Sequence, residues 1–107
     1  MTVFSVETWI VKPDKLGEYM TWHKKYETWF KKHSSEYKEV KSYKVFSHML
    51  GGNWGGYVFM TEFENLADLE KAFNKMMKSD FMTALYPEFA RLIVDGSYSV
   101  DVWNSVP

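Results

Sequence analysis

The order of the expected secondary-structure elements constrains this chain more than any other feature. Alternating and helical apolar patterns predict a strand, a helix and a strand from residue 2 to about residue 50, and the same series from about residue 57 to residue 106. The glycine-rich segment 51–56 joins the two halves. Two such units in succession fit a four-stranded antiparallel sheet with both helices on one face. The length of 107 residues predicts a single α+β domain, residues 1–107.

The expected elements have clear local signals. Strands are predicted at about residues 3–11, 40–50, 57–64 and 97–103. The first helix is predicted at about residues 15–33 with Asp14 as its N-cap, and Asn65 is the predicted N-cap of the second. The helical pattern restarts at residues 79–80. Pro87 then suits the first turn of a short final helix that ends near residue 93.

Composition excludes several classes of function. The chain has no cysteine, which excludes disulfides and thiolate chemistry. A net charge of -1 and a single arginine give no basic face, so we expect no nucleic-acid partner. No run approaches the ~18 apolar residues of a membrane span, so we expect no membrane partner. The start of the sequence lacks the pattern of a signal peptide, which predicts a cytoplasmic protein.

Recognised chemical motifs are also missing. The three histidines, His23, His33 and His48, show none of the usual short spacings of metal ligands. We therefore expect no metal and no cofactor. No Gly-x-Ser-x-Gly motif is present. Residues 51–56 lack the lysine of a phosphate loop, and two interpretations stay open: a hairpin-like connection, or a lid that places Trp54 over a pocket.

The second face of the sheet predicts self-association. Two helices cover only one face, and apolar strand residues are expected on the other. Leaving half a dozen large apolar side chains in water forgoes on the order of 10 kcal/mol, which is comparable to the stability of a small domain. We therefore predict a symmetric homodimer with its sheets face to face. The residues assigned to this second face are Val3, Trp9, Val11, Phe46, Val58, Met60 and Trp103.

Charged residues interrupt the same strands and suggest a site. One interpretation is a pocket in which Glu7, His48, Glu62 and Asp101 converge around a small ligand, with Trp9 and Trp103 as walls. The other is a set of paired charges and water near the sheet edges. Lys44 alternates with Phe46, and a one-residue slip of register would move Lys44, His48 and Glu62 to the opposite face. On the first helix, His23 is a further candidate for ligand binding.

Aromatic residues make up 19% of the chain, which is typical of interfaces and of pockets for flat ligands. On the first helix they form an arc wider than one sheet contact requires, which predicts a second contact, for example with another subunit. The residues of this arc include Tyr19, Trp22, Tyr26, Trp29 and His33.

Two segments resemble a known superfamily. Residues 6–19, with the Lys12-Pro13 pair between a strand and a helix, resemble the opening of the dimeric α/β-barrel superfamily. Residues 59–65 and 78–81 are similar to its third strand and second helix. NIPSNAP-like proteins are the nearest members, and antibiotic-biosynthesis monooxygenases and haem-degrading enzymes are cousins. The resemblance covers nearly the whole chain and implies a ferredoxin-like protomer whose dimer closes a barrel.

The resemblance carries less information about activity. Where the haem-degrading cousins have Asn, Trp and His, this chain has Glu7, Met76 and Tyr86. Three function classes follow. The first is a protein that binds a small hydrophobic or aromatic ligand between sheet and helices. The second is a cofactor-independent monooxygenase or isomerase for a flat aromatic substrate, with Glu7, His48 or Asp101 as base. The third is a structural interaction module.

The three classes predict different interiors. An enzyme should have a solvent-connected cavity above ~300 Å³ with a titratable group inside. A binding protein would have the cavity without a well-placed base. An interaction module would have a filled interior and an exposed aromatic helix face.

Overall fold

The computed structural model describes residues 2–48 and 54–107 and contains four strands and four α-helices in those ranges. In chain order the elements are β1 (Val3–Ile10), η1 (Pro13–Lys15), α1 (Leu16–His33), η2 (Ser34–Glu36), β2 (Val40–Ser47), β3 (Gly56–Phe63), α2 (Leu66–Met77), α3 (Phe81–Ala84), α4 (Tyr86–Leu92) and β4 (Ser99–Asn104).

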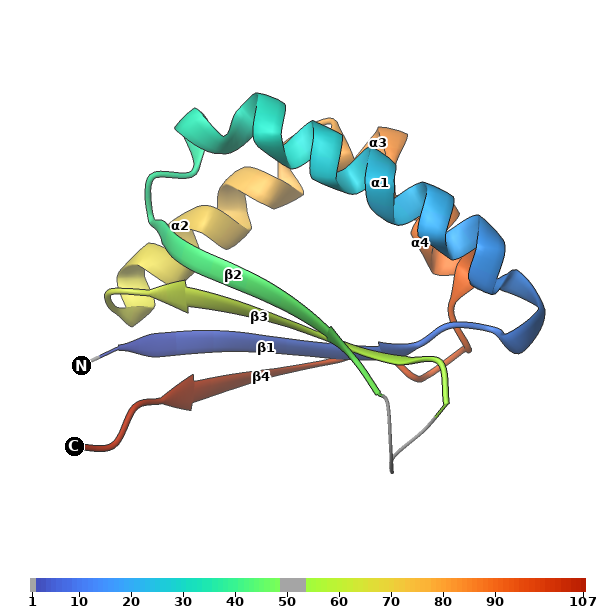
Figure 1. Ribbon diagram of the computed structural model, residues 1–107. Helices are drawn as coiled ribbons and strands as arrows, with labels where there is room; N and C mark the ends of the chain where they lie inside the picture. Colours follow the sequence, from blue (N-terminus) through green and yellow to red (C-terminus); the bar gives the residue numbers. More distant parts are fainter. Residues whose placement is uncertain (1, 49–53) are drawn as a thin grey trace.

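All four strands belong to one antiparallel sheet with the order β2-β3-β1-β4. The helices lie together on one side of this sheet and leave the other side uncovered (Figure 1). This arrangement is the ferredoxin-like α+β fold, so the fold class predicted from the order of elements is confirmed.

The ends of the elements confirm some of the predicted signals and correct others. Asn65 caps α2, since its side-chain oxygen accepts a hydrogen bond from the backbone N–H of Asp68 at 2.9 Å. Asp14 instead lies inside η1, and no side chain caps α1, so that predicted cap is wrong. β2 ends at Ser47, before the predicted end at residue 50. The first half of the glycine-rich joint, residues 51–53, lies outside the described residues. Gly55 follows it with a φ of +83°, a conformation that favours glycine.

The aromatic arc of α1 is used inside the chain. Tyr19, Trp22 and Tyr26 are buried, and α1 packs on the sheet and on α4 together. The indole N–H of Trp22 donates to the backbone oxygen of Leu85 at 2.9 Å, and its ring lies 4.9 Å from that of Phe89. The width of the arc therefore reflects two layers of contact within one protomer, and the expected contact with another subunit is not needed to explain it.

The strand register divides the sheet into two faces of different character. Trp9 packs against Tyr19, Trp22 and Phe89 under the helices, and the buried Val11 belongs to the same core. The helix-covered face alternates along β1 as Val3, Ser5, Glu7 and Trp9, opposite Phe63, Thr61, Phe59 and Tyr57 of β3. Val3, Trp9 and Val11 were predicted on the uncovered face, and the structure corrects this.

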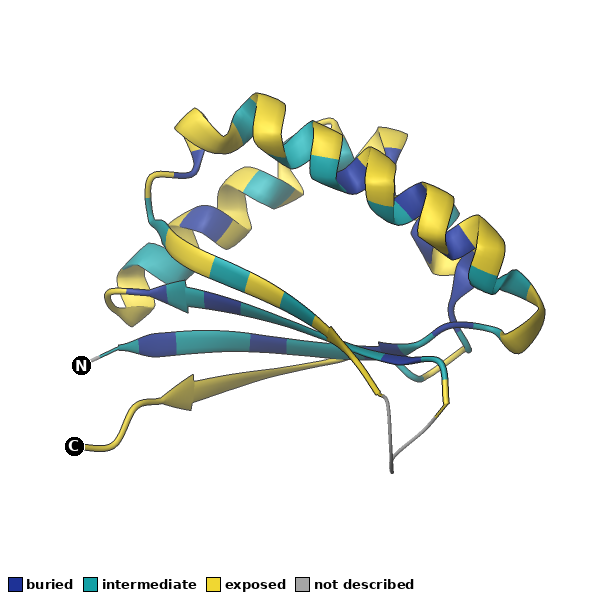
Figure 2. Cartoon of the chain, viewed as in Figure 1, coloured by how far each residue is buried: buried dark blue, intermediate teal, exposed yellow. Residues whose placement is uncertain are grey.

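We call the uncovered side the open face. It carries seven apolar side chains, which are Phe4, Val6 and Ile10 of β1, Phe46 of β2, Val58 and Met60 of β3 and Trp103 of β4. Phe46 and Trp103 are 46% and 50% exposed, whereas Val6 at the centre is buried. Lys44, Glu62 and Asp101 lie on the same face by register. β4 is exposed along its whole length (Figure 2).

Candidate functional site

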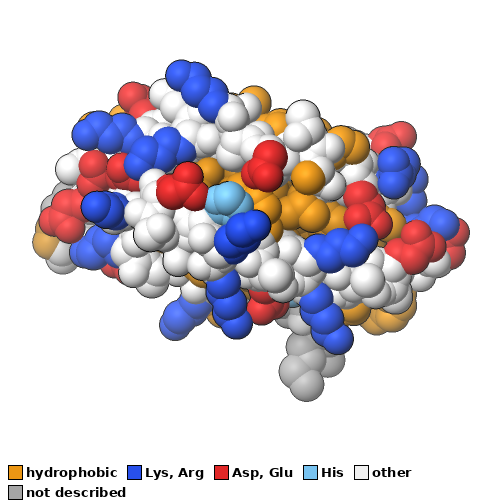
Figure 3. All heavy atoms as spheres, turned by 90° about the horizontal axis from the view of Figure 1, so that it is seen from above, with side chains coloured by type: hydrophobic (Ala, Val, Ile, Leu, Met, Phe, Trp, Pro, Cys, Tyr) orange, Lys and Arg blue, Asp and Glu red, His pale blue; other side chains and the backbone are white. Residues whose placement is uncertain are grey.

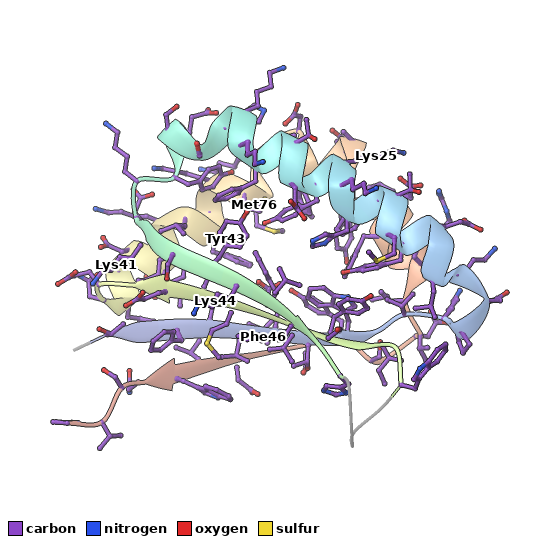
Figure 4. All side chains as sticks on the ribbon, in the orientation of Figure 1. Lys25, Lys41, Tyr43, Lys44, Phe46 and Met76 are labelled. Carbon is purple, nitrogen blue, oxygen red and sulfur yellow. The ribbon has the colours of Figure 1, made fainter. Side chains whose placement is uncertain are left out.

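A cavity lies between the helix-covered face of the sheet and helices α1 and α2. Its volume is about 110 Å³, and we call it the inner pocket. In Figure 4 Tyr43 rises from β2 towards Met76 of α2, whereas Phe46 lies on the other side of the strand. The lining residues are Ser5, Glu7, Tyr26, Phe30, Tyr37, Val40, Tyr43, Phe59, Thr61, Phe63, Leu69, Ala72, Phe73 and Met76.

Four aromatic rings form a closed series of contacts in the lining. Ring centroids are 4.9 Å apart between Phe30 and Tyr43, and 5.4 Å between Tyr43 and Phe59. The series continues from Phe59 to Tyr26 at 5.8 Å and returns from Tyr26 to Phe30 at 6.2 Å. Three of these contacts are edge-to-face, so neighbouring rings turn their faces in different directions.

Glu7 brings a carboxyl group into this apolar setting. It lies on β1 directly opposite Phe59 in the register. Its Oε2 accepts a hydrogen bond from the hydroxyl of Tyr98, which precedes β4. Burial raises the pKa of Glu7 above its ordinary value of 4.5, and the hydrogen bond from Tyr98 opposes that rise. The pocket therefore holds a carboxyl whose charged form is poorly solvated.

The other polar groups of the lining are hydroxyls. Thr61 is buried at the centre of β3, and Ser5 faces it across the register. Burial raises the pKa of Tyr26, and the nearby Glu7 and Tyr43 raise it further, so this phenol stays neutral. The lining contains no Lys, Arg or His among the described residues.

The predicted site residues do not converge. Glu7 lines the inner pocket, and Trp9 lies beside it in the core, with its indole N–H donating to the Tyr19 hydroxyl at 3.2 Å. Glu62, Asp101 and Trp103 lie on the open face, on the opposite side of the sheet. The predicted grouping of Glu7 with Glu62 and Asp101 is therefore wrong, because adjacent strand positions point to opposite faces.

The two remaining candidates lie elsewhere. His48 follows the end of β2, where its backbone N–H donates to the oxygen of Gly56 at 2.9 Å. His23 is on α1 and pairs with Glu27, four residues later, at 2.9 Å. Neither histidine lines the inner pocket. Trp54, the predicted tip of a lid, is 71% exposed and is also absent from the lining.

Sequence reasoning missed the residues that surround Glu7. Tyr26, Tyr43 and Phe59 come from three separate elements, and Tyr98 comes from the segment just before β4. Phe59 and Glu7 are partners only through the pairing of β1 with β3, two strands that are not consecutive in the chain, so no local signal placed them together. To place Tyr26 in the lining, one must know how α1 is rotated about its axis above the sheet, and the strand pattern does not give this rotation.

A second hollow of about 380 Å³ lies between the ends of α1 and α2. It exceeds the inner pocket in volume, but several of its polar side chains already have hydrogen-bonded or ion-paired partners. The Trp29 indole N–H donates to Asp80 at 2.9 Å, and His33 pairs with Glu36 at 2.6 Å. Lys75 bonds to Glu39 at 2.9 Å. We therefore regard the inner pocket as the candidate site.

Some kinds of site are absent from the part of the chain that the structure describes. Residues 2–48 and 54–107 contain no cluster of three His, Asp or Glu side chains able to hold a metal ion. In the same residues no helix is long and apolar enough to cross a membrane. Seen from the helix side, positive and negative side chains intermingle around an apolar centre (Figure 3), so neither sign dominates this surface.

Comparison with solved structures identifies proteins of the same fold. A NIPSNAP family protein from Agrobacterium tumefaciens superposes with a TM-score of 0.77 at 14% identity, covering 99% of this chain and 94% of that one. An antibiotic biosynthesis monooxygenase superposes with a TM-score of 0.71 at 15% identity, covering 98% of this chain and 99% of that one. A dimeric ferredoxin-like protein of unknown function from Bacteroides fragilis gives 0.69 at 13% identity, with 97% and 96% covered.

These comparisons confirm the fold and the structural relatives predicted from residues 6–19, 59–65 and 78–81. No family model matches the sequence, and no curated protein matches it. Identities of 13–15% are low, so the likeness establishes a shared fold, and the function has to be argued from the inner pocket itself.

Proposed function

We propose that the protein binds a small hydrophobic or aromatic ligand in the inner pocket and works as a homodimer. The observation that supports the proposal is a cavity lined by aromatic and aliphatic side chains, with a single carboxyl, between sheet and helices. Pockets for small molecules characteristically combine an apolar lining with a few polar groups that orient the ligand.

The volume limits the ligand. A cavity of about 110 Å³ is smaller than the roughly 150 Å³ that accommodates one benzene molecule. It is also below the ~300 Å³ expected of the cavity in either an enzyme or a binding protein, so only a small part of a ligand can be enclosed. A single ring or a compact head group fits at the opening, where Phe73 is 58% exposed. This size is too small for a large flat substrate, which argues against the alternative of an oxygenase for such substrates.

The homodimer is proposed from the open face. Its half-exposed Phe46 and Trp103 flank a row of apolar residues that no helix covers. A second copy could cover this row with its own open face. The B. fragilis protein of the same fold is dimeric. The cytoplasmic location and the closure of a barrel remain predictions from the sequence.

A pocket-filling variant tests ligand binding. Ala72 is buried in α2 and lines the inner pocket, so Ala72→Leu should fill part of the cavity and abolish binding of phenol and benzyl alcohol. Ala84→Leu places the same substitution on the exposed surface of α3 and should leave binding unchanged. Ligand-observed NMR measures both. Equal binding by wild type and Ala72→Leu would contradict the proposal.

A second candidate function is proton transfer, because Glu7 is the one predicted base that lines the pocket. Its raised pKa suits it to take a proton from a carbon next to a carbonyl and to return a proton at the same or a conjugated carbon. Small cyclic enones in D₂O provide the test. Deuterium should enter the ring by a protein-dependent route, and Glu7→Gln should remove that route while Asp101→Asn keeps it. Exchange at the buffer rate would exclude this function.

A further inference from the structure

We propose that the inner pocket takes the head group of a small alkylammonium cation, such as a methylated amine. This deepens the proposed function, on which it rests, by naming the chemical class of the ligand. The geometry that points to it is a carboxylate at the edge of a four-sided aromatic enclosure.

The charge of the pocket has one sign. Glu7 is the only Asp or Glu in the lining, and no Lys, Arg or His joins it among the described residues. A carboxylate or phosphate ligand would meet a like charge with no cation to offset it. A cation would supply the counter-charge that Glu7 lacks, since its one hydrogen-bond donor is the neutral hydroxyl of Tyr98.

The aromatic rings offer a second attraction for a cation. Tyr26, Phe30, Tyr43 and Phe59 contact one another in a closed series at 4.9 to 6.2 Å. The face of an aromatic ring carries negative electrostatic potential, and several such faces around one site form the usual enclosure for methylated ammonium groups. Three of the four contacts are edge-to-face, so the ring planes are not parallel and the four rings present both faces and edges along the lining.

Glu7 has an oxygen available for a ligand. Tyr98 donates to Oε2, and no described residue donates a hydrogen bond to Oε1. The register places Glu7 directly opposite Phe59, and Glu7 is close enough to Tyr26 to raise the pKa of that phenol. The carboxylate therefore lies on the same face as Phe59 and shares one pocket lining with all four rings, so a cation in the pocket can contact both the carboxylate and a ring.

The pocket size agrees with a head group. About 110 Å³ admits a compact group of a few carbon atoms, and the rest of the ligand would lie towards the exposed rim at Phe73. A neutral group of the same shape fits equally well by volume. The proposal therefore depends on charge, and the experiment has to separate charge from shape.

Choline and 3,3-dimethyl-1-butanol have the same shape and differ in that choline carries a positive nitrogen where the alcohol has carbon. Titrations followed by amide NMR shifts should show that choline binds at least tenfold more tightly than the alcohol. Glu7→Gln keeps the shape of the side chain and loses its charge. It should therefore weaken the binding of choline at least tenfold and change the affinity for the alcohol less than twofold. Asp101→Asn, on the opposite face by register, removes the same charge and should change neither.

The outcomes separate the two proposals. If the alcohol binds as tightly as choline, the cation proposal is wrong and the apolar pocket stands. If wild type binds neither compound and also fails to bind phenol, both proposals are wrong. Should Glu7→Gln fail to fold, Tyr43→Leu tests the enclosure with Glu7 in place: it should reduce the preference for choline at least fivefold, and an unchanged preference would overturn the proposal.

Discussion

The two faces of the sheet contain residues of similar hydrophobicity but use them differently. Under the helices, Trp9 is 6% exposed and its ring contacts those of Tyr57, Phe89 and Tyr98. On the open face, Trp103 is 50% exposed. On the covered face, large aromatic side chains fill the space between the sheet and the helices. The open face carries both aliphatic and aromatic side chains, interrupted by charges such as Lys44.

The comparison shows how one strand can serve two purposes. β1 sends Glu7 and Trp9 towards the helices and Val6 to the open face. A carboxyl on the covered face loses contact with water, and it can then bind a ligand or act as a base. The carboxyls of the open face are exposed or hydrogen-bonded at the surface, as Glu62 is by Ser42 at 2.8 Å. The same residue type thus has a different role on each side.

The two tryptophans give the largest expected contrast. Trp9→Ala should lower the free energy of unfolding by about 3–5 kcal/mol, because it empties the centre of the core and strands the Tyr19 hydroxyl. Trp103→Ala should cost about 1 kcal/mol or less in a protomer, because half of that side chain is already exposed. Urea unfolding measures both. Similar losses for the two variants would contradict the assignment of the faces.

The proposed dimer provides the next test. Met60 lies at the middle of the open face, between Val6 and Lys44 in the register. Met60→Lys adds a positive charge beside Lys44 and, in a face-to-face dimer, beside the same residues of the second copy. We expect the dissociation constant to rise about 100-fold, equivalent to about 2.7 kcal/mol. Sedimentation equilibrium measures it, with circular dichroism to confirm folding. A wild type that stays monomeric at micromolar concentration would remove the dimer altogether.

Much of the fold was predictable because it depends on local patterns. The strand and helix order, the cap at Asn65 and the helical first turn at Pro87 each have a signal within a few residues. The cap at Asp14 failed because a 3-10 turn intervenes before α1. In this region two competing turn geometries use the same residues, and the sequence does not separate them.

The site was predictable only in part, because it depends on which side of β1 faces the helices. Val3 and Trp9 alternate with Phe4 and Val6, so both sides of the strand are apolar and hydrophobicity cannot choose between them. Glu7 was identified as a candidate, and the structure places it in the inner pocket. The strand pairing places its predicted companions, Glu62 and Asp101, on the opposite face of the sheet. Which side of a strand faces the helices depends on how its side chains pack against the helix layer, and the pattern of a single strand does not contain this information.

The helix cover can be loosened at one end as a smaller test. α2 roofs the inner pocket and buries only Ala72, so it depends more on its cap than α1 does. Asn65→Ala removes the acceptor for the N–H of Asp68 and should cost about 1 kcal/mol. Amide hydrogen exchange in α2 should accelerate, whereas β1 should keep its protection. Asp14→Ala, at a residue that caps nothing, is the matched control and should change stability by less than about 0.5 kcal/mol.

The smallest effect concerns the pH dependence of stability. Burial raises the folded-state pKa of Glu7 above 4.5, while the unfolded chain keeps the ordinary value. The folded state therefore binds the proton more tightly, and stability falls as pH rises from about 4.5 through the raised pKa. The groups that face Glu7, Tyr26 and Tyr98, have raised pKa values themselves and stay neutral over this range.

Glu7→Gln should remove this fall in stability above pH 4.5, and should make the variant more stable than wild type once the pH exceeds the raised pKa of Glu7. Asp101→Asn should leave the fall in place, because that carboxyl lies on the open face. The hydrogen bond from Lys75 lowers the pKa of Glu39, so the stability due to Glu39 is lost as the pH falls through that pKa. This dependence on pH has the opposite sign to that of Glu7. It is the same in wild type and both variants, so it cancels when their stabilities are subtracted. Urea unfolding at four pH values provides the measurement. Parallel curves for wild type and Glu7→Gln would mean that Glu7 is well solvated, which would contradict the contrast between the two faces.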